Sequence, residues 1–126
     1  MDEADLFAFV KRIYADLEAS TNEFSFFDCI SNAHRLYIEL KCRRTHYDSL
    51  LVEKVKFDRL RNLSASMGFK PIYICSTPMG IWGFNLDKIA PVWEKSLMPK
   101  TTDFFDIEKV EKVVGYLKLD QGIKLK

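Results

Sequence analysis

The alternation of apolar and polar residues in the first third of the chain predicts one helix followed by two strands. In residues 5–19 apolar side chains recur three and four positions apart, the period of an amphipathic helix, and acidic residues precede its first turn. Residues 24–30 are short and rich in aromatic residues, which favours a strand. Residues 35–42 alternate strictly, as in a strand covered on one face. With a turn at residues 31–34, these two strands should form an antiparallel hairpin.

A second helix and a second hairpin are predicted in the middle of the chain. Apolar residues at helical spacing run through residues 49–67, and Gly68 follows them as a stop signal. Residues 71–76 and 81–85 are apolar and flank residues 77–80, a turn that contains a proline and a glycine. The order of helices and strands therefore predicts an α/β domain with a mixed sheet flanked by helices.

The C-terminal third has a weaker pattern. We expect a short helical turn within residues 86–93 and a loop at residues 96–103. Residues 109–117 fit the period of a strand and that of a helix, so both remain open.

Size and composition narrow the class of protein. The 126 residues correspond to a single domain spanning residues 1–126, and 29% charged residues with five Gly and four Pro exclude a disordered or collagen-like chain. No apolar run approaches the roughly 18 residues of a membrane span, and the acidic start is unlike a secretory signal, so we expect a cytoplasmic protein without membrane contact. Neither phosphate-loop nor dinucleotide-binding glycine patterns occur, so no nucleotide cofactor is expected. The cysteines form no metal or disulfide pattern and are expected to be buried free thiols: Cys29, Cys42 and Cys75.

The first hairpin brings acidic residues together. If it turns through residues 32–35, the numbers of opposed residues sum to 67 and Asp28 faces Glu39. Like charges opposed in this way are destabilising unless something, such as a divalent cation, neutralises them. Lys41 lies on the same strand face as Glu39. Two carboxylates that can hold Mg²⁺, beside an ammonium that can orient water, suit metal-assisted hydrolysis of a phosphodiester. The alternative is that Glu39 and Lys41 form an exposed strand pair and Asp28 merely ends its strand.

Basic residues follow this acidic patch. Their spacing suits contacts to nucleic-acid phosphates and implies no reading of base sequence. The net charge of +1 does not decide the matter, because acidic residues elsewhere can mask a basic face. The residues expected to bind nucleic acid are Arg43, Arg44, Lys54 and Lys56, with Arg59 and Arg61 further along the same helix.

The arrangement of Asp28 and the run Glu39-Leu40-Lys41 resembles the PD-(D/E)xK nuclease superfamily. Residues 37–44, Tyr47 and residues 53–60 look like those of its small phage-type endonucleases and archaeal Holliday junction resolvases, and the resemblance covers residues 6–85. Phe27 stands where the family pattern has proline. The resemblance implies a restriction-endonuclease-like core of αβββαβ type.

The same resemblance implies roles for individual residues. Asp28 and Glu39 would bind Mg²⁺, or Mn²⁺ in its place, together with the backbone carbonyl of Leu40. Lys41 would position or activate the attacking water. Many members add a glutamate from the first helix, for which Glu18 is the candidate, with Glu23 behind it.

These observations predict a Mg²⁺-dependent DNA endonuclease, and the resemblance points to Holliday junctions or other branched DNA as substrate and to a phage or mobile-element origin. Flaps, nicked duplex and ordinary double strands remain open as substrates. Cutting two strands calls for two active sites, so a homodimer is expected, with the apolar tail of residues 107–123 as a source of its interface. RNA remains open as a substrate. The alternative function is that of a non-catalytic nucleic-acid-binding or assembly protein that retains the nuclease fold.

Overall fold

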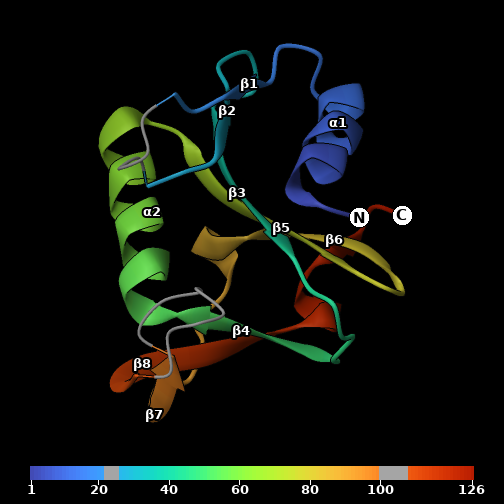
Figure 1. Ribbon diagram of the computed structural model, residues 1–126. Coiled ribbons are helices and arrows are strands. Elements are labelled where there is room, and N and C mark those ends of the chain that lie inside the picture. The colour runs from blue at the N-terminus through green and yellow to red at the C-terminus, as the bar shows by residue number, and fades with distance from the viewer. Residues whose placement is uncertain (22–25, 100–107) are drawn as a thin grey trace.

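Two sheets and two helices make up the computed structural model, which describes residues 1–21, 26–99 and 108–126 (Figure 1). The larger sheet has the strand order β1-β2-β3-β5-β6-β9, and the smaller has the order β4-β8-β7. The larger sheet comprises β1 (Glu18–Ala19), β2 (Cys29–Ser31), β3 (Leu36–Cys42), β5 (Lys70–Thr77), β6 (Gly80–Asn85) and β9 (Ile123–Lys124). The smaller sheet comprises β4 (Ser49–Glu53), β7 (Glu94–Pro99) and β8 (Lys109–Lys118). The helices are α1 (Glu3–Ile13) and α2 (Lys54–Met67), with short 3-10 turns at η1 (Leu86–Lys88) and η2 (Leu119–Gln121).

The larger sheet is mixed, as the sequence predicts. β3 and β5 run parallel, and α2 lies in the crossover between them, whereas the other neighbouring strands pair in the antiparallel sense. α1 and α2 lie on opposite sides of this sheet (Figure 1). The predicted α/β class and the β5–β6 hairpin are therefore confirmed.

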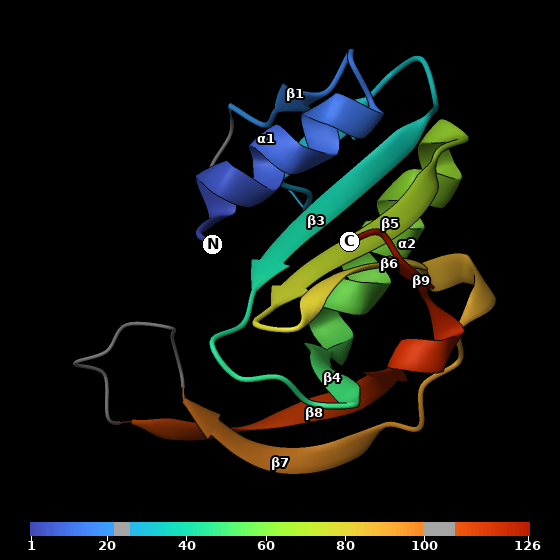
Figure 2. The same ribbon diagram turned by 90° about the vertical axis from the view of Figure 1, so that its right-hand side faces the viewer.

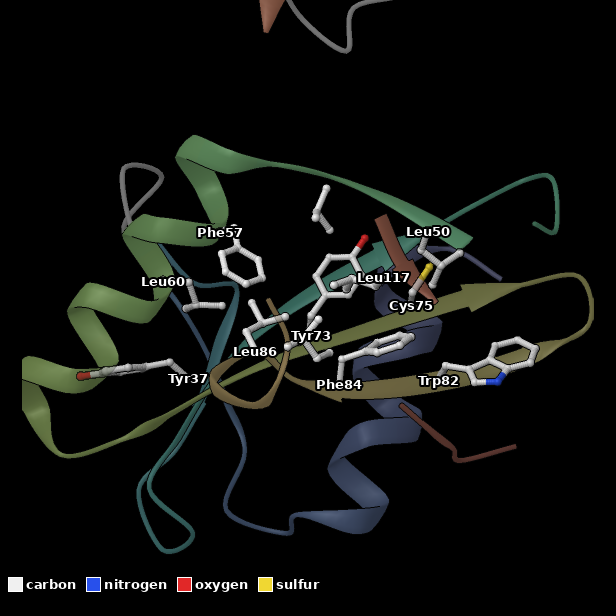
Figure 3. Packing of buried hydrophobic residues seen from close by; sticks show 12 residues of the cluster. Tyr37, Leu50, Phe57, Leu60, Tyr73, Cys75, Trp82, Phe84, Leu86 and Leu117 are labelled. Atoms are coloured by element: carbon white, nitrogen blue, oxygen red, sulfur yellow. The ribbon is translucent and has the colours of Figure 1, made fainter. Parts of the chain in front are cut away.

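Alternating residues of the central strands pack against the two helices. Leu36, Ile38 and Leu40 belong to the core beneath α1. Tyr37 and Tyr73 belong to the core on the α2 side, which also contains Leu50 and Leu117 of the smaller sheet (Figure 3). The smaller sheet thus shares one core with the α2 face of the larger one.

The first helix is shorter than the predicted residues 5–19. It begins with a capping box, in which the Asp2 carboxylate accepts a hydrogen bond from the Asp5 amide, and it ends at Ile13. Beyond this point Lys11 Nζ donates to the carbonyl of Leu17, at 2.9 Å, and the chain continues into β1, which pairs with β2. Residues 18 and 19 thus form an edge strand that pairs with β2, although their spacing fits a helix.

The second predicted helix is partly wrong, because residues 49–53 form the strand β4 and α2 begins only at Lys54. Leu50 and Val52 alternate with less buried neighbours and are buried against β8 and the core, which a strand achieves and a helix would not. The C-cap at Gly68 has a positive φ of 71°, which confirms the predicted stop.

The tail forms more structure than its pattern predicts. Residues 109–117 belong to the strand β8, and residues 96–99 of the expected loop belong to β7; the rest of that loop lies outside the described residues. Only Leu86–Lys88 of residues 86–93 form a helical turn. β2 begins at Cys29, so the predicted strand over residues 24–30 is too long: residues 26–28 are not in a strand, and residues 24 and 25 lie outside the described residues. Val114 and Leu117, expected to serve a dimer interface, are instead fully buried in the chain's own core.

Two further expectations concern membranes and thiols. Among the described residues, no helix combines the length and apolarity needed to cross a bilayer. Cys29 and Cys75 are buried free thiols as expected, whereas Cys42 is half-buried.

The close approach of β8 to the β6–β7 connection yields a prediction about stability. A Cβ on Gly115 would lie 2.9 Å from Pro91 Cβ and from two ring atoms of Trp93. Gly115→Ala should therefore lower the free energy of unfolding, measured in urea, by about 1–3 kcal/mol. Gly68→Ala is the matched control, since it meets no atom within 4 Å and only its left-handed backbone opposes the substitution. A Gly115→Ala protein as stable as the parent would contradict this packing.

Candidate functional site

The register of the first hairpin is the one that the sequence predicts. Cys29 pairs with Ile38, and Ser31 pairs with Leu36, so the residue numbers of each pair sum to 67. The turn is closed by Arg35, whose positive φ of 55° reverses the chain and whose amide donates to the carbonyl of Asn32. The short turn and the alternating strand together determine this register.

Asp28 lies one residue before the ladder begins. Its amide donates to the carbonyl of Ile38 at 2.9 Å, and its carboxylate Oδ2 accepts from the amide of Leu40 at 2.7 Å. The carboxylate therefore occupies the place that a strand carbonyl would take beside β3. Asp28 is therefore held next to Glu39 by the hydrogen bond from the Leu40 backbone amide, and not by a place in the β2–β3 ladder.

The backbone of Leu40 contributes a second oxygen on the same side. In a strand the amide and the carbonyl of one residue point to the same neighbour. Since the Leu40 amide is bonded to Asp28, the Leu40 carbonyl also faces the Asp28 side of β3. Carboxylate and carbonyl oxygens thus converge at the end of the hairpin.

Asp28 and Glu39 are partly buried, and their negative charges repel one another. Burial raises the pKa of Asp28, and the hydrogen bond from Leu40 and the charges of Lys41 and Lys56 offset this only in part. Burial, followed by the negative charge of Asp28, raises the pKa of Glu39. A bound proton or a nearby cation therefore stabilises these carboxyl groups more than it would stabilise carboxyl groups in water.

Two lysines lie near this pair. Lys41 is half-buried on β3, and its side chain makes no hydrogen bond or ion pair with any residue in the described part of the chain. Lys56 Nζ lies 3.2 Å from Glu53 Oε2, and its charge lowers the pKa of Asp28 and of Glu39, as that of Lys41 does. The carboxylates thus share their surroundings with two ammonium groups.

Glu53 and Lys112 are residues of the site that the sequence did not indicate. Glu53, at the start of α2, is 2.8 Å from Lys112 Nζ of β8. Burial alone would raise the pKa of Glu53, but hydrogen bonds from Lys112 and Lys56 and their charges hold it below its usual value. Its own negative charge adds to the rise in the pKa of Glu39. No local pattern could reveal this, because β4 and β8 are far apart in the sequence.

The acidic residue that α1 brings to the site is Glu3, and the expectation for Glu18 requires correction. Because α1 ends at Ile13, Glu18 is not helical; it is exposed on β1, opposite Ile30. Burial, followed by the charge of Asp28, raises the pKa of Glu3, while the charge of Lys41 lowers it. The acidic first turn was the signal that could have identified it. Glu23 lies outside the described residues.

The other predicted phosphate-binding residues have different surroundings. Arg43 donates to the carbonyl of Leu51 at 2.8 Å, so its guanidinium connects β3 to β4. Lys54 forms an ion pair with Asp58, whereas Arg44 is exposed. Of the four, Lys56 is the one whose charge reaches both Asp28 and Glu39. Further along α2, the Arg59 guanidinium lies 5.4 Å from the ring centre of Phe26, and Arg61 pairs with Asp87.

The donor set fits a hard cation. In the described part of the chain no three His, Cys, Asp or Glu side chains come together as a metal site. The oxygens available are those of Asp28, Glu39 and the Leu40 carbonyl, and such donors suit Mg²⁺ and Mn²⁺ rather than metals that prefer sulfur or imidazole. The remaining coordination positions would be left to water or substrate, as is usual for Mg²⁺.

The mixed sheet, its two covering helices and the position of β3 define a restriction-endonuclease-like α/β fold. In particular, the chain is similar to the structure of Hjc, a Holliday junction resolvase from the archaeal hyperthermophile Archaeoglobus fulgidus. The TM-score is 0.63 and the identity 16%, over 98% of this chain and 88% of that one. No protein-family model matches the chain, and no curated protein does. At this identity the likeness establishes the fold.

Proposed function

We propose that the protein is a metal-dependent endonuclease that hydrolyses phosphodiester bonds in branched DNA. The observation that carries the proposal is the pair Asp28 and Glu39, which are partly buried and have raised pKa values. Lys41 lies two residues after Glu39 on the same face of β3, and its side chain makes no ion pair in the described chain. A purely structural carboxylate pair would gain stability from a direct salt bridge, and among the described residues neither carboxylate has one. Perturbed carboxyl groups clustered in this way are typical of a functional site.

The residues of the chain then have separate roles. Bound Mg²⁺ or Mn²⁺ would supply Lewis-acid chemistry, activating water and polarising the phosphate. Asp28, Glu39 and the Leu40 carbonyl hold the cation, and the hydrogen bond from the Leu40 amide orients Asp28 for this. The Lys41 ammonium holds the attacking water or the developing negative charge. Lys56, oriented by Glu53, provides a further positive charge for the phosphate.

The proposed substrate rests on the fold and on the character of the basic residues. The similar protein, Hjc, is a Holliday junction resolvase. In the present chain, Lys56 and the exposed Arg44 can contact phosphates without reading bases, which suits recognition of DNA shape rather than sequence. Cutting a junction on two strands requires two active sites, so we propose that the chain acts as a homodimer.

A cleavage assay tests the proposal. Supercoiled plasmid, linear duplex and a four-way junction are incubated with the protein in Mg²⁺, in Mn²⁺ and in EDTA, beside the Glu39→Ala variant. We expect cleavage that requires metal, favours the junction and is lost in the variant. Cleavage that persists in EDTA or in Glu39→Ala would refute the proposed site, and absence of cleavage on every substrate would refute the activity.

A further inference from the structure

A pocket of about 420 Å³, partly open to solvent, lies between α2 and the segment that links β6 to β7. Its apolar wall includes Phe57, which points from α2 toward the core in Figure 3, and Trp93. This volume is within the range of small-molecule sites. Its charged rim consists of Lys54, Asp58, Arg61, Asp87 and Lys88.

The Trp93 side chain packs against the protein on one side and lines the pocket on another. Its six-membered ring packs closely over Gly115 of β8, where any side chain would displace it. The Phe57 ring meets it edge-on, with 5.1 Å between centroids and an interplanar angle of 74°. The Lys54 ammonium lies 5.6 Å from the Trp93 ring centroid. A nucleobase stacked on an aromatic side chain is held more strongly than a solvent-exposed cation over its face, so a planar ligand can displace Lys54.

Among the described residues, the ion pairs on the rim leave one cation, Lys88, without a carboxylate partner. Lys54 pairs with Asp58, and Arg61 Nε lies 3.3 Å from Asp87 Oδ1. Lys88 is exposed and makes no ion pair within the described residues. The rim therefore has three cations against two carboxylates, which favours a ligand with a single phosphate near Lys88 over a polyphosphate.

We propose that this pocket binds an unpaired nucleotide of a DNA strand, with its base stacked on Trp93 and its phosphate at Lys88. The open side suits a nucleotide within a strand, because the chain must enter and leave on either side of it. Lys54 and Lys56 are two residues apart on α2, about 200° around the helix, so the pocket and the carboxylates lie on opposite sides of its first turn. A strand crossing the start of α2 reaches both. The inference rests on the proposed function in that DNA is the substrate.

Tryptophan fluorescence tests the inference without any cleavage, in EDTA. The Trp82→Phe variant has Trp93 as its only tryptophan, and the Trp93→Phe variant has Trp82 as its only tryptophan. Trp82 is buried, with 7% of its surface exposed, and lies beside His46 and Lys124. Each variant is titrated with oligothymidylate, a four-way junction carrying unpaired thymidines, a fully paired duplex and thymidine monophosphate. We expect quenching of Trp93 by the first two, no quenching of Trp82, and binding of oligothymidylate about tenfold weaker after Lys88→Ala.

The outcomes separate this pocket from the active site. Absence of Trp93 quenching while gel shifts show DNA binding would refute the pocket, whatever the cleavage assay shows. Quenching by thymidine monophosphate at the same concentrations as by oligothymidylate would overturn the assignment to a strand and indicate a site for free nucleotides. Quenching by the oligonucleotide, with no cleavage of any DNA, would support the pocket and refute only the proposed enzyme.

Discussion

Replacing Lys41 by alanine is expected to lower metal-dependent DNA cleavage by about a thousandfold, the usual loss when one proton-transfer or charge-stabilising group is removed. The fold should be retained, because the Lys41 side chain makes no hydrogen bond or ion pair within the described chain and acts on Asp28 and Glu39 only through its charge. DNA and metal binding should persist, since the variant retains Asp28 and Glu39. Initial rates of junction cleavage, with gel shifts and metal titration on the same preparations, measure the three properties.

Lys70→Ala is the matched control for this substitution. Lys70 is exposed on β5 and pairs with Leu36, which stands at the opposite end of β3 from Lys41. The substitution therefore removes the same charge far from the carboxylates. Its cleavage rate should equal that of the parent. If the parent binds DNA and metal but cleaves no more than Lys41→Ala, the protein is a binding or assembly protein that retains the nuclease fold.

The Glu39→Gln protein is expected to be more stable than the parent at pH 7 in EDTA. Burial and the charge of Asp28 hold the pKa of Glu39 above its ordinary 4.5, so between these values the folded chain binds more protons than the unfolded chain. Stability from this group is therefore greatest below 4.5 and is lost as the pH rises through the raised value. Glutamine does not titrate, so the variant should keep at pH 7 the stability that the parent loses, which thermal unfolding would show as a higher Tm.

The pH and metal dependence make this prediction specific. The difference in Tm that depends on pH should vanish well below pH 4.5, where the Glu39 carboxyl group of the parent is neutral in both the folded and the unfolded chain. Mg²⁺ in excess should stabilise the parent more than the variant, because binding to the folded state adds stability that grows with the logarithm of the affinity. Glu94→Gln, on exposed β7, should match the parent throughout. A Glu39→Gln protein less stable than the parent at pH 7 in EDTA would show that the carboxylate is a stabilising structural group.

Local patterns were sufficient for the first hairpin and insufficient for the smaller sheet. The β2–β3 register follows from a short turn and strict alternation, both visible in consecutive residues. The spacing of Leu51, Val52 and Val55 predicts a helix where β4 forms, and the partner that selects the strand, β8, is remote in the sequence. Tertiary pairing therefore decided where local preference could not.

The candidate site shows the same division. Asp28, Glu39 and Lys41 lie within one hairpin, and the structure brings the charges of all three together. Glu3 depends on how α1 lies across the sheet, and Lys112 on a strand pairing between distant segments, so neither relation is written in neighbouring residues. The roles of these residues in binding metal and DNA stay predictions for the assays above.

The position of β8 between β4 and β7 also bears on synthesis of the chain. In the described structure β4 pairs with β8 alone, so Ser49–Glu53 has no strand partner until Lys109–Lys118 has left the ribosome (Figure 2). Pairings between such distant segments form late in folding. Glu53 then acquires Lys112 only after β8 has been synthesised, so a chain that stops before β8 would lack this part of the candidate site.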